Sequence, residues 1–127
     1  MLLLLIVEDD RDCRDVISAM LSEAGYSVHD ACDGPRALQK MRSVHPDLVL
    51  LDYGLPAPKD GEDFLRAKVA DTELVGIPVV VMSGFNLPRQ IDGAVAVIQK
   101  PFDFDGLIAL IQRFARASRK PDTNIAA

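Results

Sequence analysis

Residues 2–10 read Leu-Leu-Leu-Leu-Ile-Val-Glu-Asp-Asp, an apolar run that ends directly in three acidic residues. A continuous apolar run of this kind is typical of a strand covered on both faces, as in a parallel sheet. It is much shorter than the roughly 20 apolar residues of a membrane span, and it lacks the basic leader of a secretory signal. We therefore expect a buried strand at residues 2–7 and no membrane segment.

Four further apolar runs follow this one, and segments of helical period separate them. The expected strands are residues 26–31, 48–51, 77–82 and 94–98; the expected helices are residues 11–24, the segment from Asp33 to His45, residues 62–72 and a last helix from near Asp103. Strands that alternate with helices pair in parallel through right-handed crossovers. The sequence thus predicts an α/β fold, a doubly wound five-stranded parallel sheet with helices on both faces. We expect one domain over residues 1–117 and a tail or linker stub at residues 118–127.

The periodicity also predicts which side chains of the helices face the core. On the first helix, the predicted inward stripe is Cys13, Val16, Ile17, Met20, Leu21 and Ala24. The second helix is expected to bury Ala37, Leu38 and Met41, the third Phe64, Leu65 and Ala67, and the last Phe104, Leu107, Ile108, Ile111 and Phe114. Asp10, just before the first helix, is expected to cap it.

The composition narrows the function classes. The chain has 127 residues and a net charge of −5, with a pI of about 4.9. This acidic balance argues against a nucleic-acid surface, which needs clustered positive charge. Cys13 and Cys32 form no Cys-x-x-Cys pair, which fits a protein of the reducing cytoplasm. No glycine-rich phosphate loop follows any expected strand, so nucleotide binding is not predicted.

Polar residues follow four of the five expected strands at the point where each strand ends. They are Glu8, Asp9 and Asp10 after the first strand, Asp52 after the third, Ser83 after the fourth and Lys100 after the fifth. In an open parallel sheet, these ends share one edge, where ligands bind. The fold therefore predicts one cluster of carboxylates, a hydroxyl and an ammonium.

This combination of groups indicates a particular chemistry. Clustered carboxylates repel one another unless a cation joins them, and oxygen-only ligands favour Mg²⁺. A carboxylate beside the metal can attack phosphorus to form an aspartyl phosphate. Positive charge and hydrogen-bond donors then stabilise the phosphoryl oxygens. The cluster predicts phosphoryl transfer to an aspartate.

Four strings carry a family resemblance: Ile-Val-Glu-Asp at residues 6–9, Leu-Leu-Asp-Tyr-Gly-Leu-Pro at 50–56, Pro-Val-Val-Val-Met-Ser-Gly at 78–84 and Gln-Lys-Pro-Phe at 99–102. In this order, they resemble the receiver domain of two-component response regulators, over about residues 2–117. The resemblance implies the flavodoxin-like strand order 2-1-3-4-5. It also implies a module that is phosphorylated by a histidine kinase or a histidine phosphotransfer protein and then alters the binding of an output partner.

The resemblance assigns roles by position. Asp52 matches the phosphoacceptor. Asp9 matches a direct Mg²⁺ ligand, Glu8 a ligand that acts largely through water, and the backbone carbonyl of Gly54 completes the protein's share of the metal shell.

Three further positions match residues that interact with the phosphoryl group or leave room for it. Ser83 matches the hydroxyl that binds a phosphoryl oxygen, and Lys100 the ammonium that pairs with the aspartyl phosphate, positioned by a cis peptide to Pro101. Gly84 matches the small residue where the phosphoryl group enters.

The sequence departs from the family pattern in three places. Val97 stands where many receivers carry a switching Tyr or Phe. Lys100 follows Ser83 by only 17 positions, so a fourth helix within residues 85–94 is expected to be shortened, distorted or absent. This puts a standard dimer in doubt, and a monomer or weak dimer is expected. Tyr53, Gly54 and Phe85 occupy the positions around the acceptor where receivers tune the lifetime of the phosphate. Phe85 could shield the phosphoryl group or pack on the sheet edge.

Two alternatives to the signalling module differ in kind. A degenerate receiver could act as a binding scaffold without phosphorylation, which Val97 and the short fourth segment favour and the intact cluster opposes. An aspartyl-phosphate hydrolase would carry its nucleophile after the first strand under a cap domain, and no stretch here could form a cap. Apart from catalysing its own phosphorylation and dephosphorylation, the chain is not expected to be an enzyme.

Overall fold

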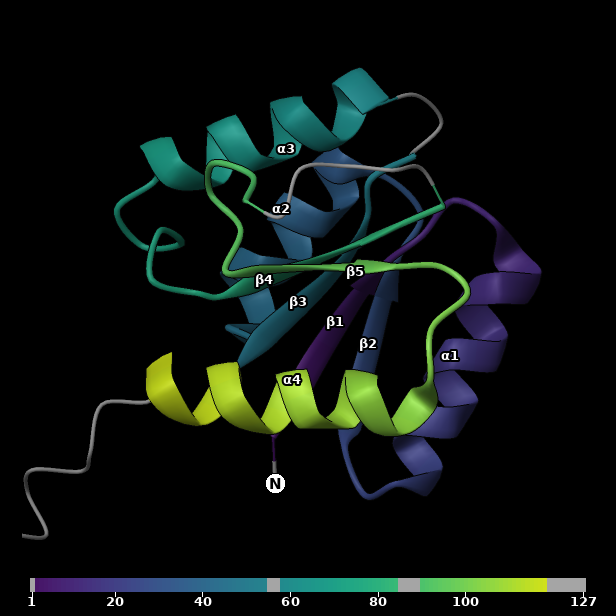
Figure 1. Ribbon diagram of the computed structural model, residues 1–127. Helices are drawn as coiled ribbons and strands as arrows, with labels where there is room; N and C mark the ends of the chain where they lie inside the picture. Colours follow the sequence, from purple (N-terminus) through teal and green to yellow (C-terminus); the bar gives the residue numbers. More distant parts are fainter. Residues whose placement is uncertain (1, 55–57, 85–89, 119–127) are drawn as a thin grey trace, which may run out of the picture.

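The computed structural model describes residues 2–54, 58–84 and 90–118. Along the chain, the elements are β1 (Leu3–Val7), α1 (Arg11–Glu23), β2 (Ser27–Ala31), α2 (Gly34–Val44), β3 (Leu48–Asp52), α3 (Pro58–Ala70), β4 (Val79–Ser83), β5 (Ala96–Gln99) and α4 (Phe104–Ser118). All neighbouring strands pair in parallel, in the order β2-β1-β3-β4-β5 (Figure 1). The predicted α/β class and strand order are confirmed.

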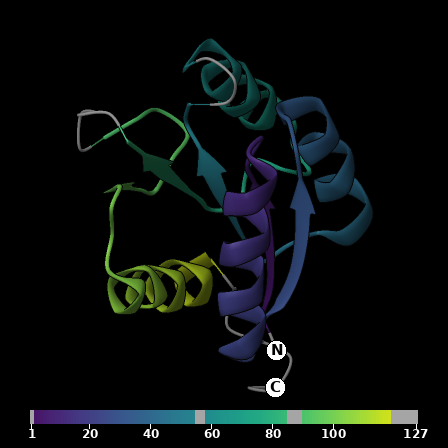
Figure 2. The ribbon, with the colours of Figure 1, turned by 90° about the vertical axis from the view of Figure 1, so that its right-hand side faces the viewer.

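Two hydrophobic cores lie on opposite faces of the sheet. The helices that cover the two faces are seen in Figure 2. Alternate residues of each strand point to opposite faces. Leu5 and Val7 of β1 therefore pack on the side of α2 and α3, whereas Leu4 and Ile6 pack on the side of α1 and α4. Since both faces are covered, the central strands are apolar at almost every position.

Local signals set the ends of the helices. The Asp10 carboxylate accepts a hydrogen bond from the Cys13 amide at 3.1 Å, so the predicted cap of α1 is confirmed. Asp33 caps α2 in the same way through Arg36, and Pro35 occupies the first turn. His45 ends α2 in the left-handed region, with φ of 48°.

The inward stripe predicted for α1 is wrong in part. Leu21 is fully buried and Ile17 packs against the core, but Val16 is 57% exposed and Met20 is 39% exposed. Cys13 is exposed as well. The buried face of α1 runs instead through Arg14, Ile17, Ser18 and Leu21, so it is rotated from the predicted stripe. The apolar residues just beside the stripe therefore remain in solvent.

The other helices follow their predicted stripes more closely. On α2, Ala37 and Met41 are fully buried, and all five apolar residues predicted for the last helix pack against its core. On α3, Phe64 and Leu65 are buried, but Ala67 is exposed. Among the described residues, no helix is long and apolar enough to cross a membrane.

Several boundaries differ from the prediction. The third helix begins at Pro58, four residues before the predicted start, and the last helix runs to Ser118, across the predicted end of the domain at residue 117. Residues 90–95, the described part of the segment predicted to hold a reduced fourth helix, contain a turn at residues 92–93 and no helix. Phe85 lies outside the described residues.

Candidate functional site

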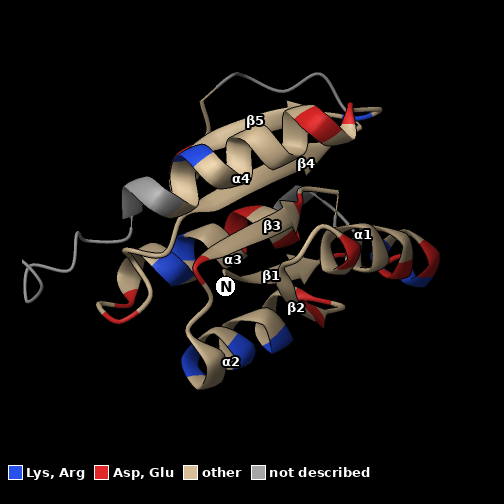
Figure 3. Ribbon diagram, turned by 90° about the horizontal axis from the view of Figure 1, so that it is seen from below, with Lys and Arg blue, Asp and Glu red and all other residues tan. Residues whose placement is uncertain are grey.

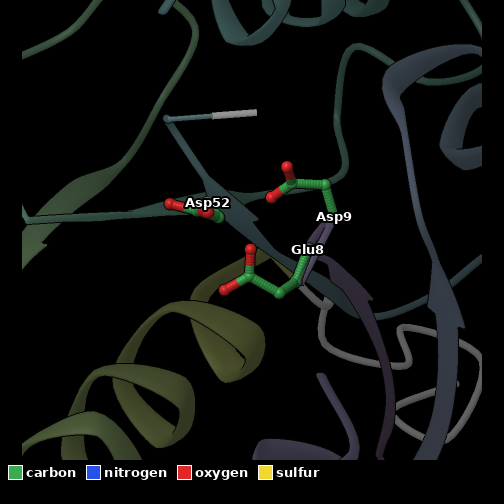
Figure 4. A group of neighbouring side chains, drawn as sticks. All are labelled: Glu8, Asp9 and Asp52. Carbon is green, nitrogen blue, oxygen red and sulfur yellow. The ribbon is translucent and has the colours of Figure 1, made fainter. Parts of the chain in front are cut away.

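Three carboxylates meet at the carboxyl edge of the sheet. Glu8 and Asp9 follow β1, and Asp52 ends β3. Because β1 and β3 are neighbours with Val7 opposite Leu51, the chain places these side chains together. Each contributes an oxygen that lies within 4.8 Å of the others (Figure 4). Sequence reasoning therefore found this cluster correctly.

Lys100 supplies the positive charge of the cluster. Its Nζ lies 3.2 Å from Oε1 of Glu8 and 3.6 Å from Oδ1 of Asp52. The backbone places it there: the Lys100 amide donates to the Ser83 carbonyl at 2.6 Å, which extends the pairing of β4 and β5. The peptide from Lys100 to Pro101 is cis, as the resemblance implies. Lys100 thus contacts two strands that are distant in sequence.

Ser83 and Gly54 border the same edge. Ser83 ends β4 and is 1% exposed. Gly54 lies in the turn after β3, where its amide donates to Oδ1 of Asp52 at 3.2 Å. Gly84 is exposed, and a Cβ built on it would meet no atom within 4 Å. The fold leaves open space at the position that the resemblance assigns to phosphoryl entry.

The cluster has too little positive charge for its carboxylates. Burial raises the pKa of Glu8 to about 7, and Asp52 adds to this through a hydrogen bond with the protonated form and through charge repulsion; Lys100 opposes the shift. Glu8 is 1% exposed, and its Oε2 has no hydrogen-bond partner. The pKa of Lys100 is raised, because Asp52 and Glu8 outweigh the effect of its burial. A buried oxygen without a partner beside two other carboxylates fits a hard divalent cation.

The raised pKa of Glu8 predicts how stability depends on pH without metal. In an EDTA buffer, we expect the free energy of unfolding to fall as the pH rises from 4.5, the ordinary pKa of a glutamate, to about 7, the pKa of Glu8. In this window, the folded state keeps a proton that the unfolded state releases. The loss is about 3 kcal/mol, because one pKa unit corresponds to about 1.4 kcal/mol, and urea denaturation at several pH values measures it. Glu8→Gln is the control and should flatten this part of the profile; equal slopes in both proteins would contradict the raised pKa.

Arg14 supports the backbone of Glu8, and sequence reasoning missed it. Its Nη1 donates to the Glu8 carbonyl at 2.9 Å, while the Glu8 amide donates to Ala31 at 3.1 Å. The Arg14 side chain is only 17% exposed, and its Nε lies 3.8 Å from Asp30 of β2. The sequence held one indication of this role: Arg14 comes one turn after Asp10, at the end of the helix that faces the cluster.

Two of the noted departures can be located. Val97 of β5 is half-buried and packs against the core on the side of α2 and α3. Tyr53 is buried, and its amide donates to the Met82 carbonyl at 2.9 Å. The ring lies against Gly61, where a Cβ would come within 2.8 Å of it. Neither side chain belongs to the charged cluster.

Comparison with known proteins agrees with this architecture. The family model described as the response regulator receiver domain matches residues 4–112. The chain is 32% identical to protein Rrf1 of Nitratidesulfovibrio vulgaris, covering 94% of this chain and 88% of that protein. It is 30% identical to sporulation initiation phosphotransferase F of Bacillus subtilis, covering 87% and 91%. Against the DNA-binding response regulator MtrA of Mycobacterium tuberculosis, at 32% identity, the match spans 94% of this chain but only 52% of the relative.

Solved structures show the same relationship. The chemotaxis protein CheY4 of Vibrio cholerae superimposes with a TM-score of 0.80 at 27% identity, over 90% of this chain and 98% of that one. The fold and the clustered strand ends define a phosphoacceptor signalling module. The chain belongs to the response regulator receiver family.

Proposed function

We propose that this chain accepts a phosphoryl group on Asp52 and thereby changes the surface that it offers to an output protein. The observation that carries the proposal is the position of Asp52. Its Oδ1 lies 3.6 Å from Nζ of Lys100, and a carboxylate oxygen of Asp52 lies within 4.8 Å of carboxylate oxygens of Glu8 and Asp9. The donor would be a histidine kinase or a histidine phosphotransfer protein. A carboxylate oxygen of Asp52 forms the bond to phosphorus as the bond from phosphorus to the donor nitrogen breaks.

The residues around Asp52 have separate tasks in this proposal. Asp9, Glu8, Asp52 and the Gly54 carbonyl would hold Mg²⁺, which neutralises charge on the phosphoryl oxygens. Lys100 holds the product by pairing with the phosphorylated side chain, and the Ser83 hydroxyl donates to a phosphoryl oxygen. Lys100 leaves Glu8 for the phosphoryl group when the charge at Asp52 grows to about −2. The Lys100 backbone then transmits the change to β5 and the loop before α4.

The remaining features of the proposal concern the setting of the module. We place it in the cytoplasm, as a monomer or weak dimer, with no nucleic-acid contact through this domain. The net charge of −5 supports the last point. The proposed domain spans residues 1–117, with the rest a tail or linker. Its chemistry is limited to its own phosphorylation and dephosphorylation.

The test uses acetyl phosphate as a small phosphoryl donor. With Mg²⁺, we expect the intact mass to rise by one phosphoryl group that hydroxylamine removes, and amide resonances of residues 83, 84 and 97–102 to shift. With EDTA, neither change should occur. If the folded protein binds Mg²⁺ but takes up no phosphoryl group from this donor or from a histidine phosphotransfer protein, the proposal is wrong.

Mg²⁺ binding without phosphoryl uptake would favour a degenerate receiver that serves as a binding scaffold. Two observations point towards it: Val97 replaces the aromatic residue of many receivers, and residues 90–95 contain no helix. Both concern the transmission of the signal and leave the charged cluster intact. We therefore keep the scaffold as the alternative function.

A further inference from the structure

Lys68 occupies a position where the pattern of α3 calls for an apolar side chain. The buried stripe of this helix runs through Gly61, Phe64, Leu65 and Lys68, with spacings of three, four and seven residues. Lys68 is 3% exposed, as buried as Leu65 in the same stripe. Lysine is almost never fully buried unless it is paired. Its place in the core of this helix therefore needs an explanation.

Among the described residues, the only partner of the Lys68 ammonium is a backbone carbonyl. Nζ donates to the carbonyl of Val75 at 3.0 Å, in the loop between α3 and β4. Burial alone lowers the pKa of Lys68, and among the described residues no acidic group opposes this effect. An ammonium has three protons to donate. Two of them have no acceptor in the described part of the chain.

The lysine lines a hollow of about 400 Å³ at the edge of the sheet where β4 and β5 begin. Its walls come from α3, the loop before β4, the segment before β5 and α4, and they include Val69, Val75, Val95 and Phe114. Lys68 is the single charged residue in this lining, so the hollow combines apolar walls with one buried cation. A volume of this size falls within the range of small-molecule sites.

The surface around the hollow is also unusually apolar. Val69, Val75 and Val95 are 50%, 47% and 43% exposed, and they are three of the five exposed large hydrophobic side chains in the described chain. Figure 3 shows charged residues dense on α1 and α2 and sparse along β4, β5 and the described part of α4. The guanidinium of Arg113 lies 5.0 Å from the ring of Phe114, which adds a second cation beside the rim.

We propose that this hollow binds a small monocarboxylic acid with an apolar chain. The carboxylate would accept hydrogen bonds from the unused protons of Lys68, and the chain would lie against the exposed valines. This pairing gives the buried ammonium the counter-ion that it lacks. The hollow lies at the amino ends of β4 and β5, whereas the carboxylate cluster lies at the carboxyl ends of the strands (Figure 1). The proposal therefore does not depend on phosphorylation of Asp52.

The test compares three probes of equal length, hexanoate, hexan-1-ol and hexylammonium, titrated into the full 127-residue chain. Two-dimensional amide spectra report where each probe binds. We expect hexanoate to shift the amides of residues 75, 76 and 93–95 in a saturable way. It should bind at least about tenfold more tightly than hexan-1-ol, since a hydrogen-bonded charge distinguishes the two. Hexylammonium should bind more weakly than either.

Two variants assign this preference to Lys68. Lys68→Met keeps the length of the side chain and removes its charge, so hexanoate and hexan-1-ol should then differ by less than about twofold. Lys40→Met is the control: Lys40 lies beside β2, and this variant should retain the full preference. Equal binding of hexanoate and hexan-1-ol to the unmodified protein, or no saturable shift at these amides, would overturn the proposal. Lys68 would then be a structural donor to Val75 alone.

Discussion

Asp52→Asn is expected to abolish the Mg²⁺-dependent increase in mass on treatment with acetyl phosphate. The amide keeps the size of the side chain but offers no carboxylate oxygen to attack phosphorus. The fold should remain intact, because Asp52 is half-buried at the strand end and its loss reduces repulsion with Glu8. In metal-free buffer, we expect the variant to be as stable as the parent or more stable, by on the order of 1 kcal/mol.

The matched control for this variant is Asp63→Asn. Asp63 lies on α3 with its side chain 52% exposed, and it pairs only loosely with Arg66 at 3.4 Å. This variant should take up the phosphoryl group like the parent. Peptide mapping of the phosphorylated proteins identifies the modified residue. Modification of Asp9 or any other carboxylate in folded Asp52→Asn would show that the acceptor has been misassigned.

Lys100→Met is expected to lower stability by about 2 kcal/mol in metal-free buffer, since it leaves a buried carboxylate cluster without its cation. For a domain of this size, that loss corresponds to a fall of about 5–10 °C in Tm. The ammonium is 27% exposed, which keeps the effect below that of a fully buried pair. Its raised pKa means that it is charged, and stabilising, throughout the neutral range.

Added Mg²⁺ should restore part of the stability of Lys100→Met, and should raise its Tm by more than it raises that of the parent. A ligand that binds only the folded state stabilises it in proportion to its affinity, and the variant has one cation fewer in competition. Arg11→Met is the control, because Arg11 is 84% exposed and should change stability by less than about 0.5 kcal/mol. A Tm of Lys100→Met that matches that of the control would contradict the ion-pair account.

The fold was predictable because its strongest signals are local. The run at residues 3–7 and the matching run at 48–52 are apolar at nearly every position, which only a sheet covered on both faces permits. Once parallel strands alternate with helices, their carboxyl ends must share one edge. The grouping of Glu8, Asp9, Asp52 and Lys100 therefore followed from topology, before any distance was known.

Other features depended on contacts that periodicity does not encode. Val16 and Met20 fit an apolar stripe on α1, but the helix turns the neighbouring face with Ile17 towards the sheet and leaves them exposed. Lys68 breaks the pattern of α3 and is buried all the same, because the loop after the helix brings the Val75 carbonyl to its ammonium. Neither outcome could be inferred from helical spacing alone.

The sequence by itself determined the class of fold, the strand order that the motifs imply, and the set of charged residues at the site. The tertiary structure decided how those charges balance. It buried Glu8 to 1% exposure, left its Oε2 without a partner, and aligned Arg14 with its carbonyl. The physical reason is that hydrophobic patterning is a local property of the chain, whereas desolvation and Coulomb interaction depend on distances between segments remote in sequence.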